Sequence, residues 1–351
     1  MKHEWKRFLI DNGAEYDAED RLVTFGNPEI ESRAALSGKV FADLSHVRVI
    51  AVHGEDAREF LQNQFTLDVR EVDARHARLG GYCTPKGRLL ALFRIFHRDD
   101  TFYLSMPGDI ADAFVQRLRL FVLRSRVTIE DVSETFVHLG AAGPDIETEF
   151  APLFDAVPAA VDEVTRSGDC LLIRVPDTVS GHRFELYGPP EWGRRLWDVL
   201  NVRCAPVGEP VWRLLRILAG VPVVRRETLE AFVPQMVNLH LLGGVSFQKG
   251  CYPGQEVVAR MQYLGKLKRR MYLLSIPEGR EPAPGDSLYS PDDPDQAAGT
   301  VVDAAPHPDG GYRALAVLRI EAAEKGDLRF GTADGPEARI LPLPYSWDTE
   351  G

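Results

Sequence analysis

The residues with the clearest chemical potential lie together in the segment FQKGCYPGQE, residues 247–256. A single thiol, Cys251, stands two positions after Lys249, in a run that also holds Gly250, a proline and Gly254. Glycine permits backbone conformations that are closed to residues with a Cβ atom, and proline fixes φ, so this run predicts a tight and rigid turn. We therefore expect Cys251 on a loop.

The chemistry expected of Cys251 is that of a thiolate. An ammonium group at Lys249 and free backbone N–H groups of the turn would favour the thiolate, which is the nucleophilic and metal-binding form. The alternative is that Cys251 is a small apolar side chain of the core. Gln255 and Glu256 either open a strand with the apolar run EVVARMQYL or bind a ligand beside the turn. The residues alone leave both alternatives open.

Composition bounds the class of protein. The chain has 351 residues, 44% of them hydrophobic and 26% charged, which is typical of a globular protein of about two to three domains. The N-terminal residues have no apolar core of signal-peptide length and no later segment approaches a membrane span, so we expect a cytoplasmic protein without membrane attachment. The four cysteines are far apart and form no CxxC pair. They predict neither a disulfide framework nor a self-contained metal site.

The net charge of −11 argues against a general nucleic-acid binder, because binding the phosphate backbone needs a broad positive surface. We expect no direct binding of nucleic acid. Two local runs are basic: Arg117, Arg119, Arg124 and Arg126, and then Arg260, Lys266, Lys268, Arg269 and Arg270 after the thiol. They are either solvated faces of a helix or strand or, in the second run, an anion-binding rim beside Cys251.

The elements that must position these residues follow from hydrophobic periodicity. A strand, a helix, further strands, a second helix and a final strand are predicted in that order at 47–52, 56–65, 82, 89–96, 101–106, 110–121 and 127–132. That order favours an antiparallel α+β layer of the ferredoxin-like kind. A second set with the same order follows, and after residue 268 short apolar runs alternate with turns rich in Pro, Gly and Asp, which favours a small β-barrel or sandwich.

At residues 238–260, NLHLLGGVSFQKGCYPGQEVVAR resembles the signature of the folate-binding YgfZ-type proteins, relatives of the glycine-cleavage T-protein, an aminomethyltransferase. The resemblance covers nearly the whole chain. It extends to VFADLSH (40–46), VRVIAVHGEDAREFLQNQFTLDV (47–69), CTPKGRLLALFRIF (83–96), VWRLLRILAGVPVV (211–224) and LPLPYS (341–346).

The resemblance implies an α+β fold in which two ferredoxin-like domains and a C-terminal β-barrel form a ring around a central opening. The implied domains are an N-terminal extension and first segment (1–46), a first folate-binding α+β domain (47–134, completed by parts of 205–265), a second α+β domain (135–204), a segment with Trp212 and the thiol loop (205–267), and the barrel (268–351).

The resemblance also implies that tetrahydrofolate or a derivative, including polyglutamylated forms, binds in the opening with the thiol loop at its edge. Partners would be iron–sulfur client enzymes, tRNA-modifying ones among them, or assembly proteins, with the protein supporting assembly or repair of their clusters. The implied functional thiol is Cys251 with its neighbour Lys249. The implied folate-contacting positions are Trp212, Tyr252, Gln255, Glu256 and Val47, where Val47 replaces a second tryptophan of the family.

Trp212 has two interpretations from its own chemistry. Its flat ring could stack on a pterin or aminobenzoyl ring. It could equally be a core residue of an apolar helix at 211–218.

T-proteins carry an acid that assists one-carbon transfer and a second acid that pairs with the donor edge of the pterin. The matching positions here are Ala91 and Leu92 for the first and Leu218 for the second. These side chains can neither move a proton nor stabilise a developing cation, so we expect no conventional aminomethyl transfer. The favoured hypothesis is a folate-binding accessory protein. The alternative is a one-carbon transferase with an altered site; a flavin-linked demethylase module is disfavoured because no GxGxxG follows a strand.

Overall fold

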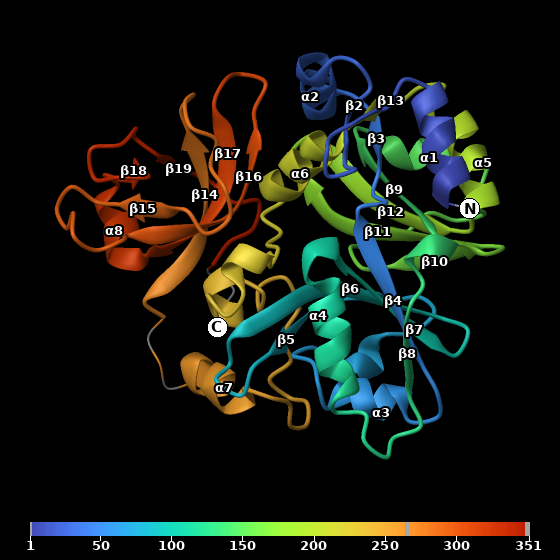
Figure 1. The fold of residues 1–351 in the computed structure, drawn as a ribbon, viewed down its shortest axis with the longest axis horizontal. Helices are drawn as coiled ribbons and strands as arrows, with labels where there is room; N and C mark the ends of the chain where they lie inside the picture. Colours follow the sequence, from blue (N-terminus) through green and yellow to red (C-terminus); the bar gives the residue numbers. More distant parts are fainter. Residues whose placement is uncertain (1, 264, 266, 348–351) are drawn as a thin grey trace.

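The computed structural model describes residues 2–263, 265 and 267–347. Its strands form three large sheets and one small hairpin, in which β1 (Glu15–Tyr16) pairs with β2 (Leu22–Thr24). Figure 1 shows the C-terminal sheet on one side of the molecule and the other two sheets, one above the other, on the opposite side. Helix α6 (Glu209–Leu218) lies between the C-terminal sheet and the upper one. This arrangement confirms the expected α+β class.

The first sheet has five antiparallel strands in the order β5-β6-β7-β4-β8. Its elements are β4 (Val47–His53), α3 (Ala57–Gln62), β5 (Arg78–Cys83), β6 (Leu89–Arg98), β7 (Thr101–Pro107), α4 (Gly108–Arg119) and β8 (Thr128–Asp131). Ile110, Phe114 and Leu118 recur at helical spacing along α4, and all three are buried in the core of this sheet. The helices and strands expected between residues 47 and 132 are therefore present, with ends shifted by a few residues.

The second sheet has six strands in the order β10-β11-β12-β9-β3-β13. They are β3 (Val40–Asp43), β9 (Val137–Gly143), β10 (Val164–Ser167), β11 (Cys170–Thr178), β12 (Gly181–Gly188) and β13 (Ala205–Val207); helices α1 (Lys2–Asp11), α2 (Pro28–Ser37) and α5 (Pro190–Leu200) accompany them. Trp5 and Leu9 of α1 share a core with Trp197 of α5. Residues 2–46 are thus part of this unit, because α1 shares its core and β3 pairs with β9 inside the sheet.

The C-terminal sheet is a curled antiparallel sheet in the order β18-β15-β16-β17-β14-β19. Its elements are β14 (Arg269–Ile276), β15 (Ser287–Tyr289), β16 (Gly299–Pro306), β17 (Tyr312–Arg319), α8 (Ile320–Lys325), β18 (Arg329–Phe330) and β19 (Arg339–Leu341). Tyr272 and Leu274 face the core inside this sheet, whereas Met271 and Leu273 pack against the core of the first sheet. The two-residue period of β14 therefore joins the C-terminal sheet to the rest of the molecule.

The segment between α6 and β14 returns to the first sheet. The Leu89 N–H donates to Phe232 O at 2.8 Å, and the Glu230 N–H donates to Leu89 O at 2.9 Å. The segment contains helix α7 (Gln255–Tyr263), so of the two alternatives for Gln255 and Glu256 the one in which they open a strand is wrong. The run was ambiguous because it is short and rich in valine, and a short apolar run does not distinguish strand from helix.

Short 3₁₀ turns complete the fold: η1 (Val69–Glu71), η2 (Ser133–Thr135), η3 (Ile146–Phe150), η4 (Arg226–Thr228) and η5 (Pro234–Val237). Within the described part of the chain, no helix combines the length and the apolarity that crossing a membrane requires.

Candidate functional site

Lys249 anchors the thiol loop. Its side chain is buried, and Nζ donates to Gln62 O at 2.6 Å, Phe65 O at 2.6 Å and Leu67 O at 2.7 Å. An ammonium group has three N–H donors, so these carbonyls use all of them. Burial lowers the pKa of Lys249 to about 8. The geometry therefore gives Lys249 the role of fixing the loop on the end of α3 and the segment that follows it.

Cys251 differs from the other three cysteines in its exposure. It is exposed, whereas Cys83, Cys170 and Cys204 are buried. Burial raises the pKa of each of these three thiols to about 12. The interpretation of a cysteine as a small core residue thus fits the other three, and Cys251 is the thiol that a partner or reagent can reach.

The residues on both sides of Cys251 hold the loop against the β5–β6 turn. The ring of Tyr252 is buried, with Lys249 Nζ 5.2 Å from its centroid. Gly254 has φ +83°, and a Cβ atom there would lie 2.5 Å from Thr84 O and 2.6 Å from the Cα of Gly87. The close approach therefore requires glycine at position 254.

The other residues of the motif start helix α7. Gln255 is half-buried, and Glu256 is exposed and pairs with Arg260 at 3.0 Å. Two members of the basic run after the motif also have partners or neighbours: Arg260 in this pair, and Arg270 over the Trp347 ring at 4.9 Å. Lys266 lies outside the described residues.

Trp212 and Val47 come together at a small cavity between the sheets. The cavity has a volume of about 100 Å³, and Leu92 also lines it. Trp212 is only 3% exposed; the guanidinium carbon of Arg183 lies 4.7 Å from its ring centroid, and Gly140 packs so closely that a Cβ atom there would be 2.5 Å from Cζ2. Trp212 is thus a core residue with one side on a cavity, and an open stacking face is not available on the Arg183 side.

Charged and polar side chains from the second sheet and from β6 line the same small cavity. They are His138, Arg183, Glu185 and Arg94. Burial by itself would raise the pKa of Glu185, but His138, Arg94 and the Tyr187 hydroxyl hold it far below its usual range. Arg183, Glu185 and Tyr187 alternate along β12, so a charged face within an otherwise apolar strand was the sequence signal for this cluster, and it was not recognised.

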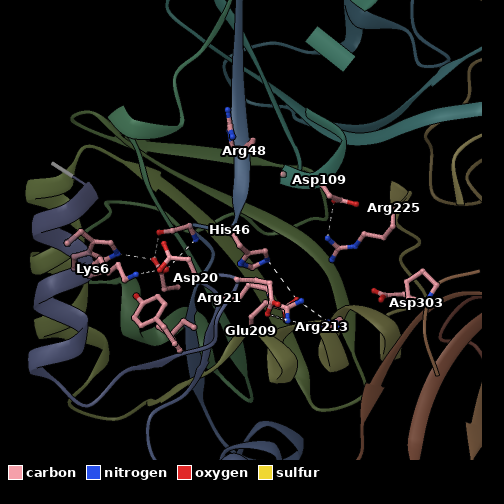
Figure 2. A pocket seen from close by; sticks show the side chains of 18 of the residues that line it. Lys6, Asp20, Arg21, His46, Arg48, Asp109, Glu209, Arg213, Arg225 and Asp303 are labelled. Atoms are coloured by element: carbon pink, nitrogen blue, oxygen red, sulfur yellow. Dashed lines mark hydrogen bonds and ion pairs between the residues drawn. The ribbon is translucent and has the colours of Figure 1, made fainter. Parts of the chain in front are cut away.

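A larger cavity of about 710 Å³ adjoins the small one, since His46 and Arg225 line both. Figure 2 shows its charged wall: Arg213 donates to Glu209 Oε2 at 2.5 Å, and Arg225 lies 3.4 Å from Asp109. Burial lowers the pKa of His46 to about 3. Residues from all three sheets or the segments beside them contribute to this wall, which places the cavity at the centre of the molecule.

The thiol loop and the small cavity are connected through one hairpin. Leu79 on β5 and Leu92 on β6 line the cavity, and the turn of the same hairpin holds Gly254. The described residues of the thiol loop, 247–256, line neither of the two cavities. The hairpin is therefore the physical link between the exposed thiol and the centre of the molecule.

Comparison with known proteins places this geometry in a family. The family described as "GCVT N-terminal domain" matches residues 14–247. The chain is 34% identical over 297 residues to the "tRNA-modifying protein YgfZ" of Klebsiella pneumoniae (strain 342), covering 84% of this chain and 89% of that protein. The protein of the same name in Serratia proteamaculans (strain 568) is 32% identical, with 85% and 90% covered.

The chain belongs to the YgfZ family. A solved structure, the glycine cleavage system aminomethyltransferase T from Bartonella henselae, superimposes with a TM-score of 0.79 over 97% of this chain and 96% of that one. At 18% identity, this likeness shows a shared fold.

In this YgfZ family member, apolar residues occupy the places where the T-protein resemblance implied acids. Ala91 is fully buried in the core of the first sheet, and Leu92 lines the small cavity. Leu218 is partly buried against the same core. The carboxylate on the wall of the small cavity is instead Glu185, which comes from a different strand.

Proposed function

We propose that this protein binds tetrahydrofolate or a derivative in its central cavities and supports the assembly or repair of iron–sulfur clusters in client enzymes, tRNA-modifying ones among them. Cys251 would be the working thiol. The observation that carries the proposal is the contrast between one exposed cysteine on an anchored loop and three buried ones. The printed name of the relatives, "tRNA-modifying protein YgfZ", supports the tRNA-related part.

The cavities suit a folate. The larger one, about 710 Å³, lies in the size range of small-molecule sites, roughly 300–1,000 Å³. The small one is lined by the rings of Phe93 and Trp212, by aliphatic side chains, and by a polar wall in which arginines outnumber the one carboxylate, Glu185. The Nε atoms of Arg183 and Arg216 are buried without a partner among the described residues, and both side chains line the small cavity. Buried donors of this kind favour a ligand that supplies acceptors.

Residues on the cavity walls would hold the folate, and the loop would not. Trp212, Val47 and Leu92 would bound its ring system, with polar contacts from the second sheet. Tyr252 is buried under the loop and Glu256 is paired on the surface, so we assign Tyr252 to loop support and leave Glu256 outside the folate contacts. The bound folate would carry a one-carbon unit. The protein would orient the folate and exclude water from around it.

Cys251 would act at the molecular surface, where a client can approach. Across the described residues, no group of three His, Cys, Asp or Glu side chains is placed to hold a metal ion. In the proposed function, a cluster or sulfur species handled at Cys251 therefore takes its other ligands from the client. An aminomethyl transferase is not favoured, because Leu92 on the cavity wall cannot exchange a proton.

Two measurements test the proposal in vitro. Titration with tetrahydrofolate should change the tryptophan fluorescence of the wild type, and Trp212→Phe should remove most of that change because this ring lines the cavity. Absence of any binding by calorimetry would contradict the folate part. If the pure protein turned over aminomethyl-tetrahydrofolate at an enzymatic rate, and Cys251→Ala kept that rate, the accessory role would be wrong.

A further inference from the structure

The wall of the large cavity has more carboxylates than cations. Of the side chains that line its volume of about 710 Å³, eight are Asp or Glu and five are Lys or Arg. Burial raises the pKa of Asp43, and Asp303 is paired with Arg216 at 2.7 Å, so these two carboxylates add little to the excess. His46 adds no positive charge, because burial lowers its pKa to about 3. Six carboxylates then remain against five cations.

Each of the five cations already has a carboxylate partner, and Figure 2 shows two of these pairs on the wall, those of Arg213 and Arg225. The pairs are Arg21–Glu19 at 3.3 Å, Arg213–Glu209 at 2.5 Å, Arg225–Asp109 at 3.4 Å, Lys6–Asp20 and Arg48–Asp131. Asp131 does not line the cavity, so the charge of Arg48 is balanced from outside it. The wall therefore has no cation that is free to bind a further anion.

A folate bound in the central cavities would bring its glutamate tail to this wall. The two cavities adjoin at His46 and Arg225, and the small one, about 100 Å³, has no room for the aminobenzoyl and glutamate parts of the ligand. Each glutamate added to a folate tail carries one more carboxylate. A carboxylate that leaves water needs a cation or N–H donors in return, and the cations of the wall are already paired.

We propose that the wall of the large cavity selects folates with a single glutamate over polyglutamylated ones. Glu227 lines the cavity as an exposed carboxylate without a hydrogen-bond or ion-pair partner among the described residues, so it repels a long tail most directly. The inference rests on the proposed function and deepens it. It narrows the ligand that the family resemblance implied, which included polyglutamylated forms.

Calorimetric titration with tetrahydrofolate that carries one or five glutamates tests the inference. At an ionic strength of about 0.02 M, the wild type should bind the monoglutamate about threefold or more tightly than the pentaglutamate. At about 0.5 M this preference should fall, because salt screens the repulsion between exposed charges. A pentaglutamate that binds as tightly as the monoglutamate at low ionic strength, or a preference that salt does not change, would overturn the inference.

Glu227→Lys reverses one charge of the wall at an exposed position, where the fold should tolerate it. At low ionic strength this variant should bind the pentaglutamate about threefold more tightly than the monoglutamate, which inverts the wild-type preference. Glu59→Lys is the matched control, because Glu59 is also exposed and without a partner among the described residues but lines neither cavity. It should keep the wild-type preference. An inversion in both variants would mean that the net charge of the chain, and not the cavity wall, sets the preference.

The outcomes separate the inference from the proposed function. A wild type that binds both ligands and favours the pentaglutamate, or a Glu227→Lys variant that keeps the wild-type preference, would overturn the inference and leave folate binding intact. A wild type that binds neither ligand would overturn both.

Discussion

Cys251 and Lys249 stand two positions apart and have opposite environments. The thiol is exposed, and the ammonium group is buried on three carbonyls. In the sequence, the two residues look like one reactive cluster, but in the structure they have different roles. Cys251 is accessible to partners, and Lys249 fixes the position of the loop that carries it. Each of these roles gives a separate prediction.

Thiol labelling tests the accessibility of Cys251. Under native conditions, iodoacetamide should modify one thiol per chain in the wild type and none in Cys251→Ser, because the other three thiols are buried. After unfolding in urea, the wild type should take up four labels per chain and Cys251→Ser should take up three. Native labelling of Cys83, Cys170 or Cys204, detected by peptide mass spectrometry, would contradict this burial.

Truncation of Lys249 should destabilise the fold. Lys249→Ala leaves the carbonyls of Gln62, Phe65 and Leu67 buried without a donor, so we expect the free energy of unfolding in urea to fall by about 3 kcal/mol. Lys86→Ala is the control, since Lys86 is an exposed lysine of the neighbouring turn and should change this value by less than about 0.5 kcal/mol. Equal effects of the two substitutions would show that Lys249 is not an anchor.

At the scale of the element, the loop depends on contact between the start of α7 and the β5–β6 turn. Only one of the two glycines beside the thiol is required there. Gly254 has φ +83° and touches Thr84 and Gly87, whereas a Cβ atom at Gly250 would meet nothing within 4 Å. The two positions therefore form a matched pair.

Gly254→Ala should reduce the free energy of unfolding by about 3 kcal/mol or more, because it combines an unfavourable φ with a backbone clash. Gly250→Ala should be neutral within about 0.5 kcal/mol. Urea denaturation of both variants checks this, and a tolerant Gly254→Ala would mean that the loop does not pack on the hairpin as described.

Elements with a clear period were predictable from the sequence, and contacts across the chain were not. The alternation before Gly54 and the spacing of Phe114 and Leu118 gave β4 and α4 directly. The first turn of α7 was ambiguous because its valines suit either element. The partners of Lys249 and the pairing of Glu185 with Arg94 join residues more than 90 positions apart, and no local pattern encodes such distances.

At the scale of the whole molecule, three sheets meet around cavities whose walls carry buried charge. His46 lies where both cavities meet, close to Glu209, Arg225, Arg216 and His138. The buried charge at the centre makes the stability of the whole fold depend on pH.

His46 should make the protein less stable in mild acid. Burial lowers its pKa to about 3, so between its ordinary pKa of 6.5 and pH 3 the unfolded state binds a proton that the folded state does not. Stability then falls as pH falls, by up to about 1.4 kcal/mol per pH unit. His97 and His307 also have lowered pKa values, so the comparison is with His46→Gln, whose urea-derived stability should fall less between pH 6.5 and 5. If the wild type and His46→Gln lost equal stability over this pH range, His46 would not be neutral and buried in the folded protein.

The most direct test of the central claim is restoration of iron–sulfur-dependent tRNA modification in cells that lack their own YgfZ-type protein. Mass spectrometry of tRNA nucleosides should show restored modification with the wild type and with the buried-thiol control Cys204→Ala. Cys251→Ala, at equal protein level, should fail to restore it. Full restoration by Cys251→Ala would contradict the account, because the exposed thiol on its anchored loop would then have no part in the function.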